Sequence, residues 1–311
     1  MKPNELAAGV DAARLERTVR QLEGPRHPRS APRELEEAEA LIADEFGGLG
    51  LAVQRQPFRF RDRTYHNIVA TLPGSNSELP WLLIGAHFDT VSNTPGADDN
   101  ASGVAVLLEI ARQLAGCRPQ RTVQLVGFNL EESQDIVGTY RVGSARFADR
   151  ARAERRRYDG ALVLEMVGYT DQRPDSQQVP PFIFKRVPNS GTFLVAVGDG
   201  RSRRLLRGFE RSIRHDNPDL TLVTYGARLR GWTLPLTRFS DNASFWDRGY
   251  PALMITDTAF LRNPHYHMDS DSADTLDYEF MASVARATLA FVAERAGTSG
   301  TGVEGGSEKV G

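Results

Sequence analysis

The stretch WLLIGAHFDTVSNTPGADDNASG, residues 81–103, opens with an apolar run and then turns polar abruptly. The run, which ends at Ala86, is typical of a strand buried on both faces of an α/β sheet. His87 and Asp89 follow it, and a loop rich in Pro, Gly, Asp and Asn leads to a segment of helical period that begins at Ser102. Because α/β proteins bind ligands beyond the carboxyl ends of their strands, we expect the functional site here.

His87 and Asp89 are two residues apart, so in extended backbone their side chains point to the same side. A metal-bound histidine usually donates its other ring N–H to a carboxylate, which fixes the tautomer. Asp89 is therefore predicted to orient His87 and not to bind the metal itself. The pair alone leaves equally open a strand-end histidine that a neighbouring aspartate satisfies without any metal.

With 311 residues, 40% of them hydrophobic and 25% charged, the chain has the composition of a soluble globular protein with one large α/β domain or two smaller ones. Its net charge of -2 predicts no polyanionic partner, so we expect no nucleic acid to bind. The basic run RAERRR, residues 152–157, is interpreted as a solvated helix face. Cys117 is the single cysteine, which excludes intrachain disulfides and a cysteine-based zinc cluster.

The first residues, MKPNELAAGVDAARLERTV, contain no apolar segment of the kind found in secretory signals. No apolar run in the chain reaches the roughly 18 residues of a membrane span. We therefore expect no membrane association and a cytoplasmic location. The sequence predicts no particular oligomeric state.

Strands and helices are predicted to alternate along most of the chain. Two helices and a β-hairpin come first, and the regular alternation that follows indicates one doubly wound, mostly parallel mixed sheet with helices on both faces. Helices are predicted over residues 11–22, 31–45, 102–115, 139–147, 201–215, 243–247 and 278–295, strands over 51–60, 64–71, 81–86, 122–129, 161–166, 192–197, 220–225 and 251–256, and a long polar loop over 168–190.

Three further strand ends carry acidic or imidazole groups. Glu131 and Glu132 follow the fourth predicted strand, and Glu165 lies within an apolar strand, where a buried carboxylate is costly unless a positive group meets it. His265 and His267 follow the last predicted strand. Each feature alone has a plain structural explanation. Together they supply imidazoles and carboxylates at one sheet edge, the C-terminal edge, and this favours a metal site there.

These residues lie in motifs that identify a family. The chain resembles the zinc exopeptidases that include bacterial leucyl aminopeptidases, glutamate carboxypeptidases and glutaminyl cyclases. The motifs follow the family's order: AHFDTV (86–91), PGADDNASG (95–103), FNLEESQDIVGT (128–139), LEMVGY (164–169), SDNASFWDRGYPAL (240–253) and NPHYHMDSDSADTLD (263–277). The resemblance implies a catalytic domain over residues 51–296, with N-terminal helices, 1–50, packed on it. The tail, 297–311, lacks an apolar face and is expected to be disordered.

The resemblance also implies two zinc ions held by five residues. His87 and Glu165 would bind one ion. Glu132 and His267 would bind the other, and Asp99 would bridge the two. Two metal ions about 3.5–4 Å apart need a shared ligand, and a carboxylate can bridge where a neutral imidazole cannot.

Within two of the motifs the resemblance selects between neighbouring residues. Asp99 is assigned in place of Asp98 because the family's bridging aspartate lies four residues before the last glycine of the motif, here Gly103. His267 is assigned in place of His265 because it follows a tyrosine and precedes the acidic run.

The catalytic roles implied by the resemblance fall on three more residues. Glu131 would be the general base that takes a proton from the zinc-bound water, whose pKa such a centre brings to about 7. The resulting zinc-bound hydroxide would attack the peptide bond. Asp89 would orient a metal-binding histidine, and Tyr266 lies where some aminopeptidases of the family steady the reacting oxyanion.

The implied function is a metal-dependent exopeptidase, most specifically an aminopeptidase that removes N-terminal residues from short peptides. Three alternatives stay open: a single-zinc glutaminyl cyclase-type acyltransferase, a carboxypeptidase, and a non-catalytic binding module on the same scaffold. A carboxypeptidase would hold a C-terminal carboxylate with an arginine such as Arg238 or those of residues 228–230. The aminopeptidase is preferred because Glu131, Glu132 and Tyr266 match aminopeptidase positions, while no arginine falls within a matched motif.

Overall fold

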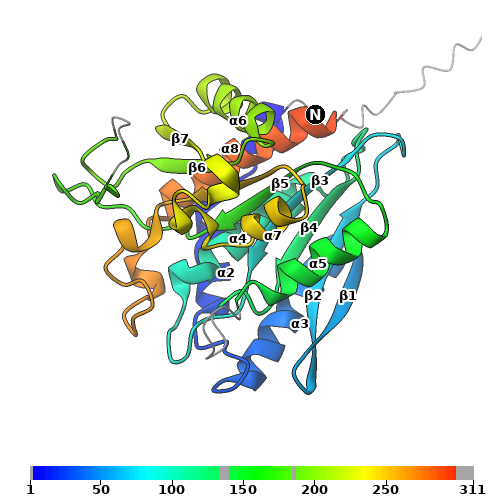
Figure 1. Cartoon of the computed structure of the whole chain (residues 1–311), viewed down its shortest axis with the longest axis horizontal. Helices are drawn as coiled ribbons and strands as arrows, with labels where there is room; N and C mark the ends of the chain where they lie inside the picture. Colours follow the sequence, from blue (N-terminus) through cyan, green and yellow to red (C-terminus); the bar gives the residue numbers. More distant parts are fainter. Residues whose placement is uncertain (1–2, 133–139, 182, 184–186, 299–311) are drawn as a thin grey trace, which may run out of the picture.

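The structure, a computed structural model, describes residues 3–132, 140–181, 183 and 187–298. Within them, eight strands form a single sheet (Figure 1). In chain order the strands are β1 (Ala52–Phe60), β2 (Arg63–Leu72), β3 (Trp81–His87), β4 (Val123–Phe128), β5 (Tyr158–Glu165), β6 (Leu194–Gly198), β7 (Leu222–Gly226) and β8 (Ala252–Thr256).

Across the sheet the strands follow the order β1-β2-β4-β3-β5-β8-β6-β7. In the described part of the chain, four of the seven neighbouring pairs are parallel, and the antiparallel ones are β1 with β2, β2 with β4, and β6 with β8. The mostly parallel mixed sheet predicted from the sequence is confirmed.

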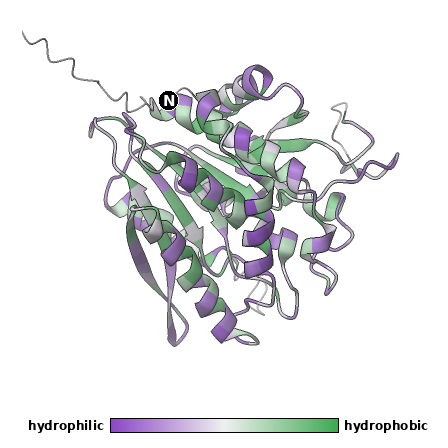
Figure 2. Cartoon of the chain, turned by 180° about the vertical axis from the view of Figure 1, so that it is seen from behind, coloured by the Kyte–Doolittle hydropathy of each residue, from purple (hydrophilic) through white to green (hydrophobic). Residues whose placement is uncertain are grey.

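Helices cover both faces of the sheet. One face carries α2 (Ala12–Leu22), α3 (Pro32–Gly48), α4 (Gly103–Leu114), α6 (Arg203–Asp216) and α8 (Tyr278–Ala296), and the other carries α5 (Val142–Ala153) and α7 (Asn242–Asp247). In Figure 2 the central strands are largely hydrophobic, and hydrophilic residues lie on the outer sides of the helices and along the edge hairpin of β1 and β2. Among the described residues, none of the helices has the length and hydropathy needed to cross a bilayer.

The N-terminal helices share a hydrophobic core with the sheet. α1 (Pro3–Ala7) and α2 pack on α8 and α4, and α3 packs on β1 and β2. Their buried side chains, Leu15, Val19, Ile42 and Phe46, belong to the same cluster as those of α4 and α8. The linker between α2 and α3 is thereby held against the body of the protein.

One predicted helix has other bounds in the structure, and one observed helix was not predicted. α5 begins at Val142, not near residue 139, because Arg141 takes up a left-handed backbone conformation with φ of 60°. The helix then continues past residue 147 to Ala153, since Phe147, Ala148 and Ala151 form a buried stripe against the sheet. The short helix α1 was not predicted. Most of the predicted disordered tail, residues 299–311, lies outside the described residues.

The register of the three central strands positions the functional site. β4, β3 and β5 run parallel side by side, and most of their residues are buried, as expected for strands covered by helices on both faces. Their carboxyl ends therefore meet at one edge. His87 ends β3, Glu165 ends β5, and Glu131 and Glu132 follow β4.

Candidate metal centre

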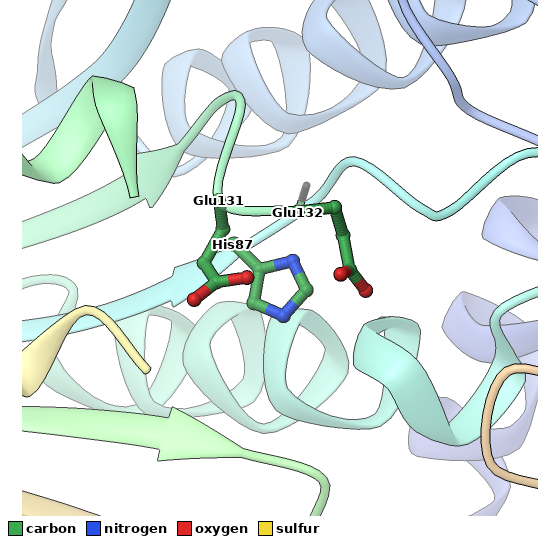
Figure 3. Close-up of side chains that lie close together, drawn as sticks. All are labelled: His87, Glu131 and Glu132. Atoms are coloured by element: carbon green, nitrogen blue, oxygen red, sulfur yellow. The ribbon is translucent and has the colours of Figure 1, made fainter. Parts of the chain in front are cut away.

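The strand-end residues converge on one point. Figure 3 shows His87 between the side chains of Glu131 and Glu132, which extend from the chain beyond β4. One ligand atom from each of these three residues lies within 4.8 Å of the others, and all three residues are buried. The adjacent carboxyl ends of β3 and β4 therefore bring two carboxylates and an imidazole together.

The five residues predicted to bind metal form two groups that share Asp99. In the first group, His87 Nε2 lies 3.3 Å from Asp99 Oδ1 and 3.5 Å from Glu165 Oε1. In the second, His267 Nε2 lies 3.2 Å from Asp99 Oδ2 and 3.3 Å from Glu132 Oε1. Each oxygen of Asp99 thus faces a different imidazole, which is the arrangement that a bridging carboxylate requires.

The donor atoms of this centre suit zinc. His87 Nδ1 lies 3.2 Å from the backbone oxygen of Asp89, so its N–H donates there and Nε2 is the nitrogen that faces the centre. Among the described residues, His87 Nε2 and Asp99 Oδ1 are buried without a hydrogen-bond partner. Imidazole nitrogens and carboxylate oxygens are the ligands of catalytic zinc sites, and a cation between them would satisfy both atoms.

Without a metal ion, protons hold these ligands together. Burial alone would lower the pKa of His87, but the carboxylates around it, Glu165 first, raise it well above its usual value. Burial would likewise lower the pKa of His267, but Asp99 and Glu132 raise it to about 10. Burial raises the pKa of Glu132 to about 7, whereas the two imidazoles lower the pKa of Asp99 despite its burial. A divalent cation would therefore replace protons when it binds.

The carboxylate of Asp89 makes different contacts from the one predicted. Its Oδ1 and Oδ2 accept hydrogen bonds from the backbone N–H groups of Glu131, at 2.9 Å, and Glu132, at 3.1 Å. Its carboxylate lies 3.6 Å from His87 Nδ1, which is too long for a hydrogen bond, so the backbone oxygen of Asp89 orients the ring. The carboxylate of Asp89 instead fixes the backbone that carries the two glutamates.

Glu131 is a further buried carboxylate beside the five residues that are predicted to bind metal. Burial raises its pKa well above the usual value, and the neighbouring charges of Glu165 and Asp241 act in the same direction. A raised pKa favours proton transfer near neutral pH, as a general base requires. Because Glu131 also lies within 4.8 Å of His87 and Glu132, its role as base and not as ligand remains a prediction.

The loop that carries Asp99 is fixed by hydrogen bonds to residues that the sequence analysis did not single out. Asp271 accepts hydrogen bonds from the backbone N–H groups of Asp98 and Asp99, at 2.9 and 3.1 Å. The Asp98 side chain belongs to neither metal group and accepts from Asn263 Nδ2, at 2.7 Å, and from Gly168 N. Asp271 lies inside the NPHYHMDSDSADTLD motif, and only that membership could have pointed to it.

Two buried polar residues from the SDNASF segment complete the centre. Ser240 Oγ donates to Glu165 Oε2 at 2.6 Å and so fixes that carboxylate. In the described part of the chain, neither carboxylate oxygen of Asp241 has a hydrogen-bond partner, and burial raises the pKa of this group to about 7. The charge of His87 lowers the pKa of Asp241, and the charges of Glu165 and Asp89 raise it.

The two histidines of the last motif differ in position. His267 belongs to the second metal group and has a left-handed backbone, with φ of 59°. His265 instead bonds Ser270 Oγ through Nδ1 at 2.9 Å and belongs to neither metal group. Tyr266 stacks on the His267 ring with a centroid distance of 3.7 Å.

Two further residues beside the centre have a left-handed backbone, as His267 has. They are Leu130, next to Glu131, and Met166, next to Glu165, and such strained backbone is typical of functional sites.

A largely apolar cavity of about 110 Å³ opens beside Glu165 and Tyr266. One water needs about 10–15 Å³ on this measure, so there is room for several waters or one bulky side chain. The cavity lies on the α5 and α7 face of the sheet, against β6, β7 and β8. Its apolar lining includes Val179, Ile183, Val195, Val197, Val223, Tyr225, Leu236, Phe239, Met254 and Phe260.

Arg238, the residue proposed for a carboxypeptidase, is already engaged. It is buried, and its Nη2 bonds both carboxylate oxygens of Asp247, at 3.0 and 2.9 Å. Its Nη1 donates to Arg230 O, and the guanidinium stacks over Trp232. A substrate carboxylate would have to displace a bidentate ion pair, which argues against this residue as a C-terminal anchor.

A family model adds the decisive comparison. The model of peptidase family M28 matches residues 67–292. The chain belongs to peptidase family M28. The resemblance inferred from the motifs is confirmed, and with it the enzyme class of a metal-dependent peptidase.

Similar proteins span most of this M28 chain. YfbL of Escherichia coli K12, named as uncharacterized, is 37% identical over 281 residues, which cover 87% of this chain and 84% of YfbL. A Trichophyton verrucosum protein named a probable leucine aminopeptidase is 26% identical over 264 residues, 81% of this chain. The match covers 62% of that fungal protein, so the chain spans about three fifths of its length.

Solved structures show the same fold in this M28 chain. An aminopeptidase from Aneurinibacillus sp. strain AM-1 has a TM-score of 0.72 at 17% identity, over 97% of this chain and 98% of that one. A glutaminyl cyclase from Porphyromonas gingivalis has a TM-score of 0.69 at 20% identity, over 92% and 99%. Both likenesses support the fold alone.

Proposed function

We propose that this M28 peptidase is a zinc-dependent aminopeptidase with two metal ions. The two groups that share Asp99 support this proposal, because in each an imidazole nitrogen lies 3.2–3.5 Å from an Asp99 oxygen and from one further carboxylate oxygen, close enough for one ion to bind all three. His87 and Glu165 would hold one ion, and Glu132 and His267 the other. When bound, the ions polarise the peptide carbonyl and lower the pKa of a water to about 7.

The remaining residues of the centre handle protons and charge. The Glu131 carboxylate takes the proton of the attacking water and later gives it to the nitrogen of the leaving amine. Tyr266 keeps its proton because burial raises its pKa, so its hydroxyl can donate to the carbonyl oxygen as negative charge develops there. Asp89 holds the backbone of Glu131 in place through the N–H group of that residue.

Recognition of the amino end of a peptide is supported by carboxylates in excess of those proposed to bind metal. Beyond the five proposed ligands, two more buried carboxylates belong to this part of the protein: Glu131 lies beside His87 and Glu132, and Asp241 follows Ser240, which bonds Glu165. Such groups suit the free ammonium of an N-terminal residue, while Arg238 is bound to Asp247. The side chain of that N-terminal residue would enter the apolar cavity beside Glu165.

Peptides blocked at either end test this proposal. A short peptide such as Leu-Gly-Gly should be cleaved, its N-acetylated form should not, and its C-terminal amide should be cleaved at nearly the same rate. Cleavage of the acetylated form with resistance of the amide would show a carboxypeptidase. An N-terminal glutamine peptide that loses ammonia and closes its ring would show a cyclase. A purified chain that binds no zinc would point to a non-catalytic module.

A further inference from the structure

Arg26 lies in the linker between α2 and α3, ahead of residues 67–292 that the family model matches. Only 2% of the surface of Arg26 is accessible to solvent, which is unusual for arginine because burial of an unpaired charge is costly. Burial lowers its pKa to about 10, so the guanidinium stays charged at neutral pH.

The guanidinium bonds backbone carbonyls on both sides of the loop that connects β3 to the Asp99 segment. Arg26 Nε donates to Phe88 O at 2.7 Å, at the first end of the loop. Its Nη1 and Nη2 donate to Pro95 O at 3.0 Å and Gly96 O at 2.9 Å, at the other end. Nη1 also donates to two carbonyls of its own segment, those of Leu22 and Gly24.

The backbone of Arg26 adds two more bonds to the same loop. Arg26 N donates to Thr90 Oγ1 at 2.9 Å, and Thr90 N donates to Arg26 O at 3.2 Å. Gly96 fits tightly within this arrangement: its backbone has φ of 63°, and a Cβ there would lie 2.5 Å from Asp99 O and 2.9 Å from Arg26 Nη2. The contact therefore leaves little freedom in the loop.

The two ends of this loop adjoin two of the three residues of the first metal group, His87 and Asp99. Phe88 follows His87 directly, and Gly96 is three residues before Asp99. We propose that Arg26 is a positioning residue of the metal centre, whose guanidinium braces the loop of residues 88–96 and so sets the separation of His87 and Asp99. This inference rests on the proposed zinc centre, but no ligand contact by Arg26 itself is involved.

Charge and geometry predict opposite effects of replacing Arg26. If the residue acted through its positive charge, Arg26→Gln would tighten zinc binding, because a cation that repels the ions would be gone. If it acts by bracing, Arg26→Gln and Arg26→Lys both weaken binding, since neither side chain can reach both ends of the loop as the planar guanidinium does. Loss of partners that orient metal ligands typically costs about 10–100-fold in affinity, and we expect a loss in that range for both variants.

Zinc affinity of the full chain, measured by competition with a chromophoric chelator, is the main readout. Cobalt substitution gives a second one, because the absorption bands of bound Co²⁺ should shift in the Arg26 variants if the ligand geometry changes. Arg14→Gln is the matched control: Arg14 also ties an N-terminal helix to the body, through Glu109 at 2.8 Å, but away from this loop. It should lower thermal stability and leave zinc affinity unchanged.

Several outcomes would overturn the inference. The first is that Arg26→Lys and Arg26→Gln both keep the zinc affinity and the cobalt spectrum of the wild type. The second is that Arg26→Gln binds zinc more tightly than the wild type. The third is that Arg14→Gln loses as much zinc affinity as the Arg26 variants. Should both Arg26 variants fail to fold, Thr90→Val removes one bond to the brace and should weaken zinc binding by a smaller factor; unchanged binding there would also reject the inference. A wild-type chain that binds no zinc would instead refute the proposed function.

Discussion

Asp89 accepts hydrogen bonds from the backbone N–H groups of both Glu131 and Glu132, at 2.9 and 3.1 Å. The carboxylate that follows β3 thus fixes the backbone that follows β4. The two glutamates keep their relative positions because the Asp89 carboxylate binds the N–H groups of both. In Asp89→Asn, the new amide nitrogen must face one of these N–H donors, so at least one bond is lost. We expect zinc affinity to fall by about 10–100-fold, as for other groups that orient ligands. Chelator competition measures this.

The matched control for that change is Asp149→Asn, which removes a carboxylate from an exposed pair with Arg248. It should leave zinc affinity and kcat/KM unchanged. Normal zinc binding and activity in Asp89→Asn would mean that the Glu131–Glu132 backbone holds its place without the carboxylate.

The roles of the adjacent glutamates separate in a pair of isosteric variants. If Glu131 is the general base, Glu131→Gln should bind zinc with the wild-type stoichiometry while kcat falls by about 10²–10⁴-fold, the usual contribution of general acid–base catalysis. Glu132→Gln should instead lose zinc, because it removes a ligand of the second group. Metal analysis of both proteins, with kcat on a leucine substrate, tests this. Loss of zinc in Glu131→Gln alone would exchange the two roles.

The strand ends explain why much of this centre could be predicted from the sequence. His87, Glu132 and Glu165 end or follow parallel strands that are neighbours in the sheet, so an apolar run followed by a polar residue was enough to bring them together. Asp99 and His267 come from loops whose paths no periodicity determines, and only the family motifs selected them over Asp98 and His265.

Other parts of the site depend on tertiary contacts that carry no local pattern. The bonds from Arg26 to the loop, from Asp271 to the N–H groups of Asp98 and Asp99, and from Asp89 to the two glutamates join residues far apart in the sequence. The start of α5 was missed because a single left-handed residue, Arg141, delays the helix, and arginine gives no signal of that conformation.

The stabilisation that zinc provides should grow as the pH rises. Burial raises the pKa of Glu132 from 4.5 and of Asp241 from 3.8 to about 7 in each case. A carboxyl group with a higher pKa in the folded state contributes stability below its unfolded pKa and loses that contribution as the pH rises through the folded value. The raised pKa of His267, about 10, acts in the same direction, because its stabilisation is complete below about pH 6.5 and is lost towards pH 10.

The zinc-free protein should therefore lose stability between about pH 5 and about pH 8. Zinc needs deprotonated ligands, so its affinity increases over the same interval. Tm measured with and without zinc at a fixed free concentration should show a gap that widens with pH. In Glu132→Gln the pH dependence of the gap should be smaller. A gap that stays constant across this interval would contradict the assignment of these groups to the centre.

The apolar cavity predicts which N-terminal residues are preferred. Val223 is half-buried on the edge strand β7 and lines the cavity, so Val223→Trp should fill it with little change to the metal ligands. One methylene in a hydrophobic pocket changes discrimination by about 10–200-fold, so kcat/KM for leucine and phenylalanine p-nitroanilides should fall by at least about tenfold. The alanine substrate, whose methyl group does not need the cavity, should be affected far less and serves as the internal control. Equal losses on all three substrates would show damage to the centre, and equal rates would show that the side chain binds elsewhere.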